Sequence, residues 1–199
     1  MNMKNSIALL AAALFSTALC AETADKNKPI QINADKLDAD EVKQTAVYSG
    51  NVRVTQGTMQ INGQRMELRE DPDGYRIVIV TVPAGQLVTF RQRRDPKTPG
   101  VEEWIAGEGE KLVYDERADR VSLSTRAKLR RLENGEQRDE TSGDTIVYDM
   151  RNARANVDGK SGASPDGRVS TTIAPRRESK PAAPAPLAPA KQLAQPPKE

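Results

Sequence analysis

An all-β fold is predicted by three features of the chain. Short segments in which apolar and polar residues alternate recur between Ile30 and Leu123, and this alternation is typical of strands with one buried face. Pairs that favour tight turns, such as Asn62-Gly63 and Asn134-Gly135, separate these segments. A short motif also repeats along the chain. Stacked strand pairs of this kind build a solenoid, a jellyroll or a sandwich.

Residues 1–21 have the features of a secretory signal peptide. Lys4 precedes an apolar run from Ile7 to Leu19, which is shorter than the ~20 residues that span a bilayer. We expect cleavage after Cys20 or Ala21, which leaves an exported chain without cysteine. Two alternatives stay open, namely lipoprotein processing at Cys20 and a retained membrane anchor.

The body, residues 22–174, contains all the strand-like segments. The alternation indicates strands in chain order at residues 30–33, 45–49, 52–55, 59–62, 66–69 and 121–124. Residues 37–47 also fit a helix, although the end of that segment favours a strand. An Ile- and Val-rich hairpin is predicted at residues 75–82.

The internal repeat supports this organisation. Residues 109–117, GEKLVYDER, match residues 143–151, GDTIVYDMR, and weaker copies begin at Gly63 and Ala34. Each copy has a small residue, two polar residues and an aliphatic residue, and then continues into a short strand.

Residues 175–199 form a predicted disordered tail. Proline and alanine dominate it and no hydrophobic period remains, so it cannot bury enough apolar surface to offset its ordering entropy. A tether to the cell wall or a membrane surface is the functional alternative. The excess of basic residues lies in this tail, which leaves the body without the charge pattern of a nucleic-acid binder.

The composition also excludes several kinds of chemistry. The chain has no histidine and one cysteine, which excludes a Ser-His-Asp triad, a Cys-His pair and a zinc site of nitrogen and sulfur ligands. Two pairs of carboxylates, Asp38 with Asp40 and Asp71 with Asp73, lie in turn-like sequence. A periplasmic hydrolase would need such pairs about 5–9 Å apart in a cleft. We expect no enzyme activity, no cofactor and no metal ion.

Strands that are apolar on one side only can be used in two ways. The apolar side, mostly Ile, Val, Leu and Met, can fill itself as an ordinary core. It can also stay open along one edge and accept acyl chains, for which Met59 and Met66 suit irregular, flexible ligands. The residue pattern alone leaves both possibilities open.

Several motifs resemble the OstA/LptA family of periplasmic lipopolysaccharide transport proteins. They are residues 32–37, 48–57, 58–63, 88–92, 143–148 and 167–175, so the resemblance covers roughly residues 28–175. It implies a slightly twisted, open β-jellyroll of antiparallel strands in the periplasm. The interior would shelter the acyl chains of lipid A and leave the sugars outside.

The resemblance also implies partners. The chain would pass lipopolysaccharide from an LptC-like inner-membrane protein to an LptD-like outer-membrane protein, joined by edge-strand pairing, and would associate head to tail with itself. Three alternatives remain: an LptC-like or LptD N-terminal module, a β-scaffold that binds no lipid, and a hydrolase.

The predicted lining of the acyl-chain groove comes from two sources. The resemblance supplies four positions, and the alternation within strands supplies the others. The complete set is Ile30, Ile32, Phe90 and Tyr114 from the resemblance, with Val52, Val54, Met59, Ile61, Met66, Leu68, Leu112, Leu123, Ile146 and Tyr148 from the alternation. Each of these positions could equally be a plain core residue.

Two basic segments are candidates for contacts with phosphate. Residues 91–100, RQRRDPKTPG, are predicted to be a basic loop in which Arg91, Arg93 and Arg94 bind phosphate, and a solvated loop is the alternative. The second segment contains Arg126, Lys128, Arg130 and Arg131, which alternate with apolar residues. This alternation indicates a polar outer face.

Overall fold

The computed structural model describes residues 25–95, 98, 100–159 and 167–175. The predicted signal peptide lies outside the described residues, as does the predicted tail beyond Pro175. Within the described ranges, no helix is long and apolar enough to cross a membrane. The strands are β1 (Ile30–Asn33), β2 (Lys36–Asp40), β3 (Thr45–Gln56), β4 (Met59–Glu70), β5 (Arg76–Thr81), β6 (Val88–Arg94), β7 (Glu103–Gly109), β8 (Lys111–Asp115), β9 (Arg120–Glu133), β10 (Glu136–Asp149), β11 (Arg154–Asp158) and β12 (Ser170–Ile173).

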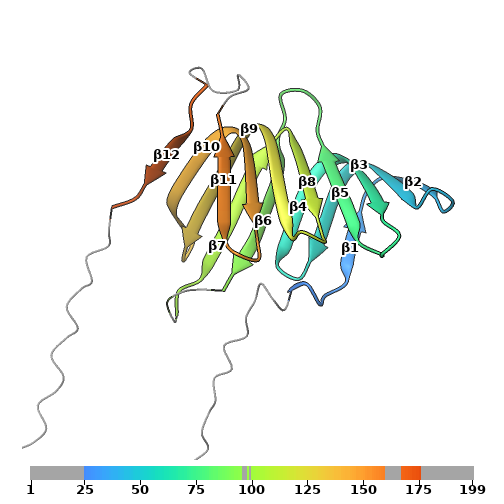
Figure 1. The fold of residues 1–199 in the computed structure, drawn as a ribbon, viewed down its shortest axis with the longest axis horizontal. Coiled ribbons are helices and arrows are strands. Elements are labelled where there is room, and N and C mark those ends of the chain that lie inside the picture. The colour runs from blue at the N-terminus through green and yellow to red at the C-terminus, as the bar shows by residue number, and fades with distance from the viewer. Residues whose placement is uncertain (1–24, 96–97, 99, 160–166, 176–199) are drawn as a thin grey trace, which may run out of the picture.

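All these strands pair antiparallel, and the pairing divides them into two half-sheets (Figure 1). Half-sheet A contains, in order, β1, the second half of β3, the first half of β4, β6, β7, the second half of β9, the first half of β10, and β12. Half-sheet B contains β2, the first half of β3, the second half of β4, β5, β8, the first half of β9, the second half of β10, and β11. The long strands β3, β4, β9 and β10 belong to both half-sheets, and they bend at one corner that joins the two. The turns at the far ends of the strands form two separate rims opposite this corner, one for each half-sheet.

The corner is made by irregularities in the long strands. The register shifts between Ser49 and Val52 and between Gly143 and Thr145. In β9, Thr125 and Arg126 adopt positive φ angles of 64° and 55°, in a region that non-glycine residues rarely occupy. Bulges of this kind bend a strand and increase its twist, and this is how one sheet folds over on itself.

The internal repeat marks the positions where strands cross this corner. Gly63, Gly109 and Gly143 each lie where the chain passes from half-sheet A to half-sheet B. A Cβ atom on Gly63 would lie 2.3 Å from Val80 Cγ1, and one on Gly143 would lie 2.7 Å from Val157 Cγ1. A larger residue would therefore clash with the neighbouring strand. The first copy of the repeat along the chain has Ala34 where the other copies have glycine, and Ala34 lies between β1 and the end strand β2.

The core lies between the two half-sheets. Leu123 of half-sheet B places its Cδ1 atom 2.6 Å from the position that a Cβ of Gly107 in half-sheet A would occupy. The missing side chain of Gly107 thus makes room for the opposite layer. The buried apolar residues of both half-sheets form one cluster, and their exposed fractions lie between 0% and 7%.

The predicted fold class is confirmed, with one local correction. Residues 75–82 are not a hairpin of their own, because they contribute the single strand β5, which pairs with β4 on one side and β8 on the other. Residues 37–47 contain no helix, because they lie in β2, in the turn that follows it and in the start of β3. Pairing of β2 with β3, and of β3 with β4, outweighs the weak helical propensity of that short segment.

Candidate functional site

All the predicted lining residues lie on the inner face of the folded sheet. Cross-strand pairing joins them into rows that run from strand to strand. In half-sheet B one row runs through Tyr48, Met66, Val80, Leu112, Leu123 and Ile146, and in half-sheet A one runs through Ile32, Val54, Ile61 and Phe90. Eleven of the fourteen are 5% exposed or less, and Ile30, Ile32 and Leu68 are partly buried against the same cluster.

The interior is closed in this structure. Its side chains pack against one another, as in an ordinary core. Burial, followed by the negative charges of nearby acids such as Asp119, raises the pKa of Tyr114, so this phenol stays neutral and packs in the core cluster. The most deeply buried of these residues, such as Met66 and Leu112, are therefore not accessible from solvent in this conformation.

Sequence reasoning missed part of this interior. The buried apolar residues outside the predicted set are Val78, Val80, Val88, Ile105, Val121, Ala127, Leu129 and Met150. Most of them could have been found by the same rule, because Val78 and Val80 alternate within β5 and Val88 lies two residues before Phe90. Val78 and Val80 were not predicted as lining residues because residues 75–82 were assigned to a separate hairpin.

The apolar row of half-sheet B continues to the end strands on both sides of the molecule. Figure 1 shows β2 and β12 at opposite ends of the line of strands. At one end this row finishes in Val157 of β11, which is paired opposite Ile146. Leu37 in β2 is paired opposite Tyr48 and continues the row at the other end, whereas Ile173 in β12 is paired opposite Asp139 and ends an inner row that is mostly polar. They are 52% and 73% exposed because no further strand covers them within the described part of the chain.

A short segment before β1 bridges the two rims. We call residues 25–28 the N-terminal strap. The side chain of Gln56, at the rim of half-sheet A, donates hydrogen bonds to the carbonyl oxygens of Lys26 and Lys28, each 3.2 Å long. On the other side, Lys26 forms an ion pair with Asp119, in the turn between β8 and β9. Asp119 is only 2% exposed. Because the strap contacts both rims, it ties half-sheet A to half-sheet B across the side opposite the corner.

The predicted basic loop at residues 91–100 is wrong in its first part, because Arg91, Arg93 and Arg94 lie in strand β6. Arg91 and Arg93 point outward, and the Arg91 guanidinium stacks 4.2 Å from the centre of the Trp104 ring. Arg94 points inward and forms a 2.9 Å ion pair with Glu103. The antiparallel pairing of β6 with β7 satisfies the backbone of this segment and outweighs its polar composition.

The second basic segment also divides between the two faces. Lys128 and Arg130 lie on the outer face, where Arg130 pairs with Glu108 and Glu140 at 2.8 and 2.6 Å. Arg131 corrects the prediction of a uniformly outward polar face, because it is paired between the inward residues Ile105 and Asp139. Strand register decides the face of each residue here, whatever its polarity.

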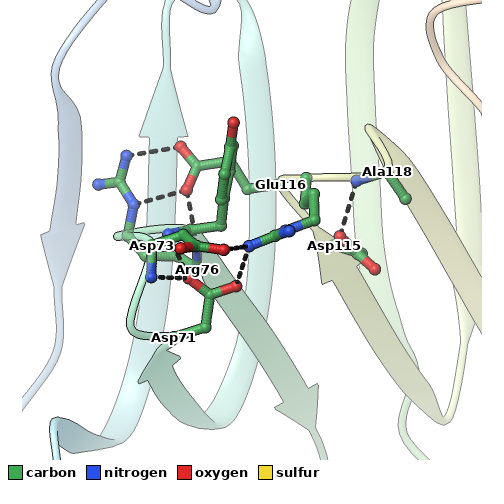
Figure 2. A network of polar contacts seen from close by, with 8 residues as sticks. Asp71, Asp73, Arg76, Asp115, Glu116 and Ala118 are labelled. Carbon is green, nitrogen blue, oxygen red and sulfur yellow. Dashed lines mark hydrogen bonds and ion pairs between the residues drawn. The ribbon is translucent and has the colours of Figure 1, made fainter.

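The rim of half-sheet B carries a network of ion pairs (Figure 2). Arg76 makes two hydrogen bonds of 2.9 and 2.6 Å to the Glu116 carboxylate. Asp71 and Asp73, one of the carboxylate pairs noted above, both contact Arg117. The Asp71 carboxylate also accepts hydrogen bonds of 2.9 Å from the backbone of its own turn. These acids therefore stabilise adjacent turns of the rim.

This network predicts a loss of stability in acid. Burial alone raises the pKa of Glu116, but the hydrogen bonds and charge of Arg76 outweigh it and hold that pKa below the ordinary value of 4.5. A carboxyl whose pKa is lower in the folded state stabilises the fold above its unfolded pKa, and this contribution is lost as the pH falls through the folded value. We expect the free energy of unfolding to decrease below about pH 4.5, and Glu116→Gln to make this decrease shallower. Urea unfolding at several pH values measures it, and equal slopes for the two proteins would contradict this origin.

These features together define a class of protein, an antiparallel β-jellyroll with an apolar interior and with end strands that have a neighbour on one side only among the described residues. The chain belongs to the family described as LptA/(LptD N-terminal domain) LPS transport protein, whose family model matches residues 31–154.

Curated relatives and a solved structure agree with this membership. The chain is 29% identical over 172 residues to the lipopolysaccharide export system protein LptH of Pseudomonas aeruginosa, covering 85% of this chain and 92% of that protein. It is 28% identical to LptA of Haemophilus influenzae over 87% of this chain and 93% of that one, and 27% identical to LptA of Escherichia coli over 88% and 85%. The crystal structure of Pseudomonas aeruginosa LptH superposes with a TM-score of 0.62 at 27% identity, over 76% of this chain and 99% of that one. These relatives are named as lipopolysaccharide export proteins, not as enzymes.

Proposed function

We propose that the protein carries lipopolysaccharide across the periplasm, with the acyl chains of lipid A held between the two half-sheets and the sugars outside. The observation that carries this proposal is the continuous apolar inner row of half-sheet B, which reaches the end strand β2 on one side and the end strand β11 on the other. An acyl chain cannot cross water unprotected, because each exposed CH₂ group costs about 0.8 kcal/mol. The names of the relatives support the same cargo.

The end strands provide a route for handing the cargo on. β1 and β2 lie at one end and β11 and β12 at the other, and each lacks a partner on one side within the described residues. Unpaired strand edges accept another strand by backbone hydrogen bonding. An LptC-like protein at one end, an LptD-like protein at the other, and copies of this chain between them would align their inner rows.

The closed interior favours a second candidate, a periplasmic β-scaffold that binds no lipid. Its inner face would be a permanent core, which agrees with exposed fractions of 7% or less. The two candidates differ in one property, which is whether the half-sheets ever separate to admit a lipid.

Photo-crosslinking in living cells distinguishes them. A photoreactive amino acid replaces Ile32, Phe90 or Tyr114 on the inner face, and Arg53 on the outer face of β3 serves as the control. For a carrier we expect adducts containing lipopolysaccharide at the three inner positions and none at Arg53. A folded, exported protein that yields no lipid adduct at any inner position would instead support the scaffold.

A further inference from the structure

The inner face of half-sheet A changes from apolar to polar toward its rim. Along β6, the inward residues are Val88, Phe90, Gln92 and Arg94, in that order. Cross-strand pairing places Arg94 opposite Glu103, and Glu103 opposite Glu133. We call the inward polar residues of this region the inner polar cluster, which consists of Gln92, Arg94, Glu103, Arg131, Glu133, Arg138 and Asp139.

The cluster is balanced in charge but not in hydrogen bonds. Arg94 pairs with Glu103 at 2.9 Å, with side chains only 11% and 6% exposed, and Arg131 donates a 2.7 Å hydrogen bond to Asp139. Two buried atoms are nevertheless left without a partner among the described residues, namely the Oε1 atom of Gln92 and the Nε atom of Arg94. Buried polar groups are almost always paired in native proteins. An unused acceptor and an unused cationic donor, two residues apart on the same face of β6, point to a polar ligand.

We propose that the inner polar cluster binds the phosphate-bearing head group of the lipid, an inference that rests on the proposed function. Arg94 donates from Nε to a phosphate oxygen, in the manner in which guanidinium groups bind phosphate. Gln92 accepts from a neighbouring hydroxyl or amide N–H of the same head group. In the unloaded protein, the Glu103 carboxylate takes the place of a phosphate as the anionic partner of Arg94.

The position of the cluster matches the order of groups in such a lipid. Gln92 lies two residues from Phe90, about 6.6 Å along a strand, and on the same face. The head group therefore binds near the rim while the chains extend over Phe90 and Ile61 toward the corner. Toward the same rim, Arg131 and Glu133 are 34% and 23% exposed, so they can turn toward water when a phosphate takes their place.

The test compares two lipids that differ only in phosphate. The probes are purified lipid A and the same lipid after enzymatic removal of its phosphates, and dissociation constants are measured for the full-length mature protein. We expect the wild type to bind the phosphorylated lipid about tenfold more tightly. The variant Arg94→Gln/Glu103→Gln removes both members of the buried pair and so leaves no unpaired charge. It should bind both lipids with the affinity that the wild type shows for the dephosphorylated one.

Arg93→Gln is the matched control, because Arg93 immediately precedes Arg94 in β6 and is exposed on the outer face. It should keep the full preference for phosphate. A wild type without any preference, or a double variant that keeps it, would overturn the proposal. So would loss of the preference in millimolar inorganic phosphate, because the site would then bind free anions. Failure of the proposed function looks different, since the wild type would then bind neither lipid.

Discussion

Replacing Phe90 by alanine is expected to lower the free energy of unfolding by about 3–5 kcal/mol. Phe90 is 2% exposed and lies opposite Ile61 on one side and Gly107 on the other. The neighbouring glycine has no side chain to fill the space that the ring leaves. The variant therefore loses both the buried area of the ring and the contacts around the cavity.

Urea unfolding followed by the fluorescence of Trp104, the single tryptophan of the chain, measures this loss. Thr89→Ala is the control, because Thr89 is the preceding residue and is exposed on the outer face. Its effect should stay within about 0.5 kcal/mol. A loss below 1 kcal/mol for Phe90→Ala would mean that the two half-sheets are not packed together at this position in solution.

The second large effect is expected when Lys26 is replaced by glutamate. The new carboxylate faces Asp119, whose ion pair with Lys26 ties the two rims together. Removing one member of an ion pair leaves the charge of the buried member, here Asp119, without compensation. Because Lys26 is itself 41% exposed, we expect closure to weaken by only about 1–2 kcal/mol, which raises the population with an open strap about five- to thirtyfold.

Two measurements follow this opening. Amide hydrogen exchange in residues 116–119 should accelerate, and lipopolysaccharide should associate faster by a similar factor, because the proposed cargo reaches the inner rows only after the rims separate. Lys28→Glu is the control, since it adds the same charge change to an exposed residue of the same strap. Faster exchange without faster association would show that the lipid enters by another route, such as the uncovered ends.

The strand-level organisation of this protein could be predicted from its sequence. Alternation in segments such as Val52–Thr55 and Met59–Asn62 depends only on which residues avoid water, so it identified the inner face correctly at the ten positions that it supplied. The glycine-led repeat was equally visible, and it proved to mark the corner. The reason for the glycines was not visible, because it lies in the side chains of neighbouring strands.

Register and long-range contacts were decided by the tertiary structure alone. Arg94 and Arg131 face the interior because the pairing of β6 and β9 with β7 places them there, although a basic run by itself favours a solvated loop or an outer face. The contact between Lys26 and Asp119 joins residues 93 positions apart, and no local pattern encodes it. The preference of each residue for burial or exposure is a property of that residue alone. The partners of a charged side chain depend instead on how distant strands align, and that alignment is fixed only when the sheet folds over on itself.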